Sequence, residues 1–323
     1  MTQERRGLGE DLKKALGRLP GVENAFGEPL ARHVSFGIGG PADAFCTVRE
    51  PDALRRLLDC LAESGLPWMP LGRGTNVVFP DSGFRGAVVR LAGDFGRVET
   101  DGTFLAAGAG ATLSALVETG LAAGLGGLEF TAGIPGCVGG SLPGNSGTTE
   151  EALGDRLDWA EIVHPGSAAR RYRAVDLDFG YRASRLSSMG GAIVSARFRM
   201  EPREPDRIRE ILLRFMERRR GQPHEAPNAG CIFKNPRGTS AGKLIDAAGL
   251  KGLRMGGIAV SERHANFMLN TGRASAEDLV AAIVAVRERV RATAGILLET
   301  EIRLLDETGR PVDLNGGRSG KAA

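Results

Sequence analysis

The sequence is poor in aromatic residues, cysteine and histidine. Phe, Trp and Tyr make up 5% of the 323 residues, and there are only four cysteines and four histidines. Cys46, Cys60, Cys137 and Cys231 match no zinc or iron–sulfur spacing, and a chain of this length does not suggest a disulfide framework. The scattered histidines also argue against a metal enzyme. We therefore expect mostly buried, reduced thiols and a cytoplasmic protein.

The chain also lacks a long apolar run and an excess of either charge. No stretch reaches the roughly 18 consecutive apolar residues of a membrane-spanning helix, and residues 1–20 contain no apolar segment typical of a secretory signal. The formal net charge is +3. This composition predicts neither membrane insertion nor nucleic acid as the main partner, and nothing in it requires more than a monomer.

Glycine, by contrast, is abundant. Its 47 residues gather in GIGG at 37–40, in LGRGTN at 71–76 and in the stretch 124–147. Clustered glycines indicate loops that pass close to a ligand, because a Cβ would prevent the approach. LGRGTN has neither the P-loop nor the GxGxxG pattern, so it is either a backbone nest for a phosphate or an ordinary tight turn.

The run GIPGCVGG at 133–140 is more specific. Four glycines and a proline within eight residues force an irregular backbone, which a packed domain tolerates best against a large ligand. Together with LGRGTN, this loop would suit an extended dinucleotide.

Helix and strand signals alternate without a regular repeat. Helices are expected at 52–65, 113–124, 206–221, 241–249 and 276–294, with caps that include Thr112, Ser240 and a Ser275–Asp278 capping box. Strands are expected at 87–91, 103–108, 192–200, 266–270 and 301–305. This order predicts an α+β protein of two or three domains, and the charged segment 200–206 is typical of a domain boundary.

Three further motifs carry reactive or charged groups, each with a plainer alternative. Arg182, in FGYRAS, could clamp a carboxylate or phosphate, or it could be a solvated surface group. Cys231, in AGCIFKNP, could donate a proton, because a thiol has a reference pKa of about 8.5, or it could be an inert buried thiol. Glu299 and Glu301 are two residues apart, so they share one face of an expected strand. One of them could point into a cleft as an acid or a hydrogen-bonding partner, or both could form a solvent-facing edge.

In this order the motifs resemble those of the UDP-N-acetylenolpyruvoylglucosamine reductases, flavoproteins of peptidoglycan synthesis and hence of cell shape and division. The resemblance covers roughly residues 30–305 and rests on SFGIGGPADAF, LGRGTNVVF, GLEFTAGIPGCVGG, FGYRAS, AGCIFKNP, AGKLIDAAGLKG, VSERHANFMLN and LETEIRLL. It implies two subdomains of the vanillyl-alcohol-oxidase-like (PCMH-type) class that hold FAD non-covalently, followed by an α+β substrate domain. The boundaries we expect are 1–90 for the N-terminal segment and first FAD subdomain, 91–203 for the second, 204–307 for the substrate domain and 308–323 for a disordered tail.

The resemblance also implies a reaction in which NADPH reduces FAD and the reduced flavin delivers hydride to the methylene carbon of an enolpyruvyl UDP-sugar. Its implied catalytic residues are Arg182, which would stabilise charge developing on the carboxylate, Cys231, which would protonate the α carbon, and Glu301, which would assist. Serine is usual in the family where this chain has Cys231. The positions that match FAD contacts are Gly72, Gly74, Thr75, Asn76, Gly133, Ile134, Gly136, Gly139 and Gly140. Those that match substrate contacts are Tyr181, Lys234, Asn235, His264 and Asn266.

Some positions depart from the family pattern. SLPGNSGTTE replaces A-x-x-MNAGAYG after GIPGCVGG, although Asn145 and Gly147 remain. Gly37 and Thr75 stand where a basic residue and a serine are usual. A tyrosine-bearing lid of one branch is missing, so we expect the shorter, type II-like branch.

Two other interpretations stay open. Another flavoenzyme of the same fold would share the two glycine loops but would be coloured without responding to NADPH. A nucleotide-binding protein without catalysis would keep the loops and lose the reactive residues. Retention of Arg182, Cys231 and Glu301 argues against the second.

Overall fold

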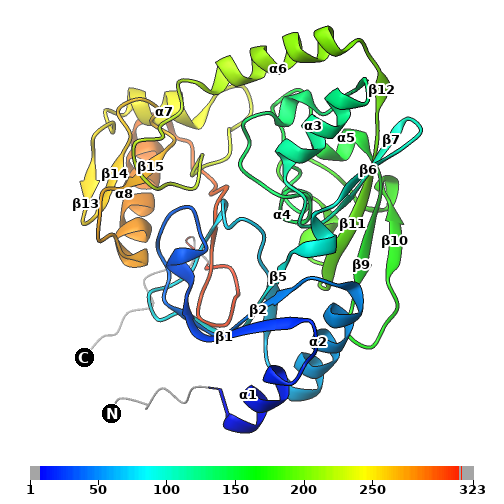
Figure 1. The fold of residues 1–323 in the computed structure, drawn as a ribbon. Helices are drawn as coiled ribbons and strands as arrows, with labels where there is room; N and C mark the ends of the chain where they lie inside the picture. Colours follow the sequence, from blue (N-terminus) through cyan, green and yellow to red (C-terminus); the bar gives the residue numbers. More distant parts are fainter. Residues whose placement is uncertain (1–7, 313, 315–323) are drawn as a thin grey trace, which may run out of the picture. The chain divides into compact units, whose positions relative to one another are not determined.

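The computed structural model describes residues 8–312 and 314 and divides into two compact units. Unit 1 comprises the chain up to residue 28, residues 42–73 and residues 86–221. Unit 2 comprises residues 29–41, residues 74–85 and the chain from residue 222 onward. Figure 1 shows the fold and labels many of the helices and strands described below.

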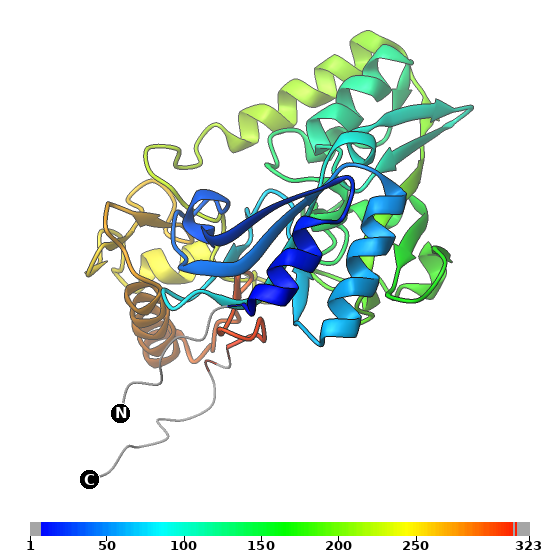
Figure 2. The ribbon, with the colours of Figure 1, turned by 60° about the horizontal axis from the view of Figure 1, so that its bottom comes forward.

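The first layer of unit 1 is a four-stranded sheet with the order β1-β2-β5-β3. Its strands are β1 (Val22–Pro29), β2 (Pro41–Val48), β3 (Trp68–Pro70) and β5 (Phe84–Leu91). Helix α2 (Pro51–Ser64) packs a leucine stripe onto this sheet, and α1 (Glu10–Gly17) lies beside α2 (Figure 2). The predicted helix end is confirmed, because Gly65 follows α2 with a left-handed φ of 66°.

The second layer of unit 1 is an antiparallel five-stranded sheet with the order β10-β9-β11-β7-β6. Its strands are β6 (Val98–Asp101), β7 (Phe104–Gly108), β9 (Leu157–Val163), β10 (Arg170–Arg173) and β11 (Ala192–Arg199). Helices α3 (Leu113–Ala122), α4 (Val138–Ser141) and α5 (Leu153–Arg156) contribute to the apolar core of this layer. The short strands β8 (Leu125–Gly126) and β12 (Glu201–Pro202) pair with each other, and α6 (Pro205–Arg219) follows.

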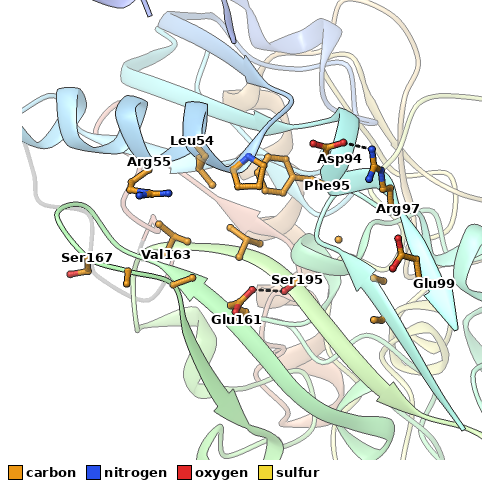
Figure 3. Close-up of a pocket in the computed structure, with 17 residues that line it drawn as sticks. Leu54, Arg55, Asp94, Phe95, Arg97, Glu99, Glu161, Val163, Ser167 and Ser195 are labelled. Carbon is orange, nitrogen blue, oxygen red and sulfur yellow. Dashed lines mark hydrogen bonds and ion pairs between the residues drawn. The ribbon is translucent and has the colours of Figure 1, made fainter. Parts of the chain in front are cut away.

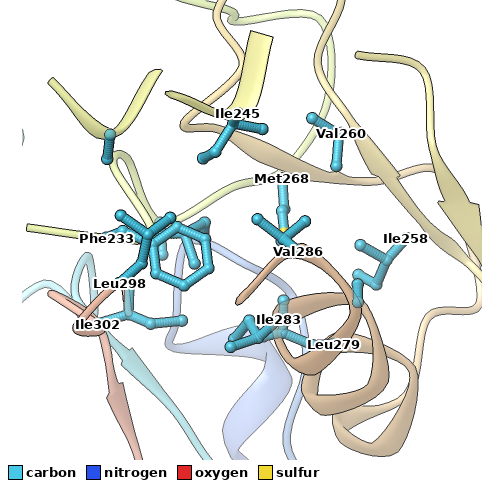
Figure 4. Packing of buried hydrophobic residues seen from close by; sticks show 14 of the residues in the cluster. Phe233, Ile245, Ile258, Val260, Met268, Leu279, Ile283, Val286, Leu298 and Ile302 are labelled. Atoms are coloured by element: carbon cyan, nitrogen blue, oxygen red, sulfur yellow. The ribbon is translucent and has the colours of Figure 1, made fainter. Parts of the chain in front are cut away.

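Unit 2 is built around helix α8 (Ala276–Ala294). The expected Ser275–Asp278 capping box begins α8, and Gly295, with a φ of 71°, ends it. The core also involves α7 (Ala241–Ala247) and the sheet β13-β14-β15, formed by Arg254–Met255, Ile258–Val260 and Met268–Asn270 (Figure 4). Strands β4 (Val77–Val78) and β16 (Arg303–Leu304) form a parallel pair.

The units do not follow our predicted domain boundaries. The segments 29–41 and 74–85 belong to unit 2, because Phe36, Ile38 and Val78 are part of its core. No local pattern indicated this, since it depends on contacts between distant parts of the chain.

Two predicted ends are also displaced. Helix α6 belongs to unit 1, where it contacts Glu129–Thr131 and α3, so the division follows Gly221 and not the segment 200–206. The tail does not begin at residue 308, because Leu305 pairs with Pro311. Residue 313 and residues 315–323 of that tail lie outside the described residues.

Candidate active site

The first glycine loop follows β3 and is packed tightly on both of its sides. In unit 1, a Cβ on Gly72 would lie 2.5 Å from the Sγ atom of Cys137, in the second loop. In unit 2, a Cβ on Gly74 would lie 2.3 Å from the carbonyl oxygen of His33. Both contacts are shorter than any ordinary carbon contact, so only glycine fits these two positions.

The second glycine loop, residues 133–140, is equally constrained within unit 1. A Cβ on Gly136 would lie 2.6 Å from the Oγ atom of Ser141, and one on Gly139 would lie 2.8 Å from the Cβ atom of Ala109. Gly140 lies beside Cys137, whereas Ile134 packs against the apolar core. Gly133 has a φ of 76°, which favours glycine.

Arg219, at the end of α6, holds the segment that leads into this second loop. Its guanidinium donates hydrogen bonds to the carbonyl oxygens of Ala132 and, at 2.9 Å, of Phe130. Burial and the neighbouring Arg182 lower the pKa of Arg219. The loop is thus anchored by a cation that lies close to a second cation, an arrangement suited to an anionic ligand.

The backbone of the first loop is suited to a phosphate. Among the described residues, no protein acceptor takes the backbone N–H groups of residues 72–76. Consecutive N–H groups in a glycine turn form an anion-binding nest. The two glycine loops therefore fit the pyrophosphate and neighbouring parts of a dinucleotide such as FAD.

Arg182 is held in a strained backbone conformation on unit 1. Its φ is 53°, and its guanidinium donates to the carbonyl oxygens of Asn145 and Gly147 over 3.4 and 3.3 Å. The aromatic ring of Tyr181 lies 5.5 Å from the guanidinium carbon, and Tyr181 is exposed. A non-glycine residue at positive φ persists only where its surroundings enforce it, which is common at functional sites.

Asn145 helps to hold the loop that contains Arg182, although Asn145 lies in the segment that departs from the family pattern. Its buried side chain donates to the carbonyl oxygen of Gly180 over 3.0 Å and accepts from the N–H of Gly154 over 2.8 Å. The divergent segment therefore still ties the loop that carries Arg182 to its neighbours.

Cys231 and Glu301 lie on adjacent extended segments of unit 2. The N–H of Glu301 donates to the carbonyl oxygen of Ile232 over 2.8 Å, and the N–H of Lys234 donates to the carbonyl oxygen of Glu299 over 2.9 Å. The Asn76 side chain donates to the carbonyl oxygen of Glu301 over 3.1 Å. Unit 2 thus joins the backbone segments that contain Cys231 and Glu301 and ties the second segment to the end of the first glycine loop.

The predicted substrate-contacting residues of unit 2 occupy different settings. Lys234 forms an exposed ion pair with Glu299 at 3.4 Å, a contact that contributes little to stability. The side-chain oxygen of Asn235 accepts from the N–H of Ala241 at the start of α7. The Nδ1 atom of His264 accepts from the N–H of Asn266 over 3.3 Å, and burial lowers the pKa of His264.

A cavity of about 280 Å³ in unit 2 joins several of these groups. Cys231, Asn235 and His264 line it. So do the cations Lys243, Lys251 and Arg263, together with Asp246. These three cations were not singled out from the sequence, although all three lie within the motifs AGKLIDAAGLKG and VSERHANFMLN.

Comparison with known proteins assigns the family. The family profile for the UDP-N-acetylenolpyruvoylglucosamine reductase C-terminal domain matches residues 222–305, and the profile for an FAD binding domain matches residues 42–171. Over 295 residues the chain is 44% identical to UDP-N-acetylenolpyruvoylglucosamine reductase of Heliobacterium modesticaldum, covering 90% of this chain and 93% of the relative. The chain belongs to the UDP-N-acetylenolpyruvoylglucosamine reductase family.

Further relatives agree with this assignment. UDP-N-acetylenolpyruvoylglucosamine reductase of Geobacter metallireducens is 43% identical over 281 residues, covering 87% of this chain and 93% of the relative. The crystal structure of UDP-N-acetylenolpyruvylglucosamine reductase from Thermus caldophilus superposes with a TM-score of 0.76 at 37% identity, covering 88% of this chain and 98% of that one.

Membership of the reductase family confirms three sequence-based predictions. The protein is an FAD-dependent oxidoreductase of peptidoglycan synthesis, its fold is the α+β flavoprotein fold we expected, and its cofactor is FAD. The roles of individual site residues stay predictions. No helix in the described part of the chain is long and apolar enough to cross a membrane.

A second cavity lies away from the residues that the reductase family places at its site. It has a volume of about 470 Å³ and lies in unit 1, between α2 and the outer face of the five-stranded sheet. Leu54, Phe95 and Val163 line it, and Figure 3 shows the ion pair of Asp94 and Arg97 beside it. None of the predicted site residues lines this cavity.

Proposed function

We propose that the protein reduces the enolpyruvyl ether of UDP-N-acetylglucosamine to UDP-N-acetylmuramate with NADPH as the reductant. The proposal is supported by the reductase relatives, which match the chain over most of its length, and by the backbone hydrogen bond from Glu301 to Ile232, which joins the segments that contain Cys231 and Glu301. The glycine loops supply the FAD-binding backbone. When bound there, FAD would supply the redox chemistry that carries a hydride from NADPH to the methylene carbon of the enolpyruvyl group.

Arg182 stabilises the charge that this addition creates. Hydride attack on the methylene carbon pushes electrons through the α carbon into the substrate carboxylate. A guanidinium presents two parallel N–H donors to a carboxylate and keeps its charge at any physiological pH. The hydrogen bonds of Arg182 with Asn145 and Gly147 hold its guanidinium in place before the negative charge develops. The side chain therefore needs little reorganisation during the reaction.

Cys231 protonates the α carbon in this proposal. The Cys231 thiol gives its proton to the carbon, the new C–H bond forms, and the thiolate is reprotonated from solvent. Glu301 lies on the adjacent segment and assists by hydrogen bonding or proton delivery. A thiol is intrinsically more acidic than the serine hydroxyl usual in the family, so the pH dependence differs from that of a serine enzyme.

The substrate diphosphate is held by groups of unit 2. Lys234, Asn235 and His264 match family substrate contacts, and the last two line the 280 Å³ cavity together with its three cations. An anionic nucleotide-sugar is the ligand class that such a cavity attracts. Tyr181, exposed beside Arg182, completes the predicted substrate contacts. A cytoplasmic location is part of this proposal, because the reaction consumes NADPH and a nucleotide-sugar, and so is a monomer, because nothing in the sequence requires more.

Substitution of Cys231 tests the proposal by separating the two half-reactions. In Cys231→Ala, we expect NADPH to reduce the flavin at the wild-type rate and the UDP-sugar to reoxidise it at least about 100-fold more slowly. Cys231→Ser restores a protic group and should recover much of the loss. Mass spectrometry of the wild-type product should show two added hydrogen atoms. Unchanged reoxidation in Cys231→Ala would remove the thiol from the mechanism.

A further inference from the structure

Asn266 binds the backbone of the segment that carries Cys231. Its side-chain oxygen accepts from the N–H of Phe233 over 2.9 Å, and its side-chain nitrogen donates to the carbonyl oxygen of Phe233 over 2.8 Å. Its own carbonyl oxygen accepts from the N–H of Ile232 over 2.8 Å. Asn266 therefore makes three hydrogen bonds to the two residues that follow Cys231.

These bonds hold the side-chain amide of Asn266 against the backbone of Phe233, although Asn266 also lines the 280 Å³ cavity. Asn266 is 2% exposed. Its amide oxygen accepts from a backbone N–H, and its amide nitrogen donates to a backbone carbonyl oxygen. The substrate contact that the family resemblance implied for Asn266 stays a prediction. The hydrogen bonds to Phe233 give the same amide a structural task.

The remaining contacts of this segment restrict its movement further. The ring of Phe233 is buried in the core of unit 2, close to Leu298 (Figure 4). Cys231 pairs with Phe267, and the carbonyl oxygen of Ile232 accepts from the N–H of Glu301. Ile232 is thus bonded to Asn266 through its N–H and to Glu301 through its carbonyl oxygen.

We propose that Asn266 is a positioning residue that fixes the Cys231 thiol relative to Glu301, an inference that rests on the proposed role of Cys231. The side chain needs both a donor and an acceptor on one rigid plane, because Phe233 presents one of each. Aspartate lacks the donor and would bring a charge into a buried site. Asn266 also donates its N–H to His264, so the same residue orients a side chain of the cavity.

The first test measures the position of the thiol without using enzyme turnover. FAD-loaded wild type, Asn266→Asp and the control Asn270→Asp are treated with iodoacetamide, and alkylation of Cys231 is followed by peptide mass spectrometry. Asn270 lies at the end of β15 and also bonds backbone groups, of Phe36 and Gly272, but not the Cys231 segment. Asn266→Asp should change the alkylation rate of Cys231 by on the order of fivefold, the effect of one lost hydrogen bond. Cys60 should react at an unchanged rate in all three proteins.

The second test is a double-mutant cycle with Cys231→Ala, read in the reoxidation of reduced flavin by the enolpyruvyl UDP-sugar. Asn266→Asp should slow this step about tenfold or more when Cys231 is present and by less than about twofold when it is absent. Reduction by NADPH should not change. If Asn266→Asp does not bind FAD, Asn266→Ser, which removes the paired bonds without adding a charge, is used in its place.

The outcomes separate this inference from the proposed function. Equal losses in both backgrounds, or unchanged alkylation of Cys231, would overturn the positioning role. If the wild-type flavin is not reoxidised by the UDP-sugar at all, the proposed function fails, and the alkylation rates still decide whether Asn266 fixes the thiol.

Discussion

Replacing Gly72 by alanine should weaken FAD binding through one identifiable collision. The new Cβ would lie 2.5 Å from the Sγ atom of Cys137, whereas non-bonded carbon atoms normally approach to about 3.5 Å. The sulfur would have to move by roughly 1 Å, and Cys137 is enclosed, with 5% of its surface exposed. Forcing such overlap into a packed region costs about 1–3 kcal/mol.

This cost can be measured as affinity or as stability. If the glycine loop shifts to relieve the overlap, the Kd for FAD should rise about 10- to 100-fold, because each 1.4 kcal/mol is tenfold. If the overlap remains, the Tm should fall by about 3–10 °C. Titration of the flavin-free protein with FAD, followed by flavin fluorescence, measures the first quantity, and thermal denaturation measures the second.

Two further variants show whether the collision is the cause. Cys137→Ala removes the sulfur, and the next atoms, of Gly140, would lie 3.6 and 3.8 Å from the new Cβ. In the Cys137→Ala background, Gly72→Ala should therefore change the Kd by less than about threefold. Gly144→Ala is the matched control, because nothing lies within 4 Å of its added Cβ. Wild-type affinity and Tm in Gly72→Ala would refute the steric argument.

Three more predictions follow from individual side chains. Arg182→Lys keeps the positive charge but loses the planar guanidinium with its paired N–H donors. Reoxidation of flavin by the UDP-sugar should slow about 100-fold, with little change in reduction by NADPH. Equal losses in both half-reactions would contradict this prediction. Asn145→Ala removes two buried hydrogen bonds and should lower the free energy of unfolding by about 2 kcal/mol, measured by urea denaturation. A loss below about 0.5 kcal/mol would show that Asn145 does not hold the loop that contains Arg182. Burial, together with the charge of Lys251, lowers the pKa of His264 in the folded chain. The unfolded chain therefore binds a proton at His264 more readily than the folded chain does. The free energy of unfolding should fall as the pH drops below about 6.5. His264→Gln should flatten the dependence of Tm on pH between about 5 and 7, and an unchanged slope would show that another group is responsible.

Local signals in the sequence predicted the helices well. Ser275 with Asp278, Thr112 and Ser240 each cap the helix that we expected, and Gly65 and Gly295 end theirs. Capping depends on residues three or four positions apart, so a linear pattern contains the required information.

Contacts between distant segments could not be predicted in the same way. The expected strand at 301–305 is reduced to Arg303–Leu304, because only these two residues pair with β4, whereas Glu301 bonds Ile232. The motif resemblance included Asn266, but only the folded chain shows that its amide binds the backbone of Phe233. The same limit explains why the cations of the 280 Å³ cavity were missed.

An anaerobic stopped-flow experiment on the FAD-loaded protein tests the central claim most directly. NADPH is added first and the enolpyruvyl ether of UDP-N-acetylglucosamine second, while the visible flavin spectrum is recorded. We expect NADPH to bleach the flavin and the UDP-sugar to restore its colour. A flavin that bleaches but is not reoxidised by this sugar would contradict the proposed substrate, and a protein that takes up no FAD would contradict the account as a whole.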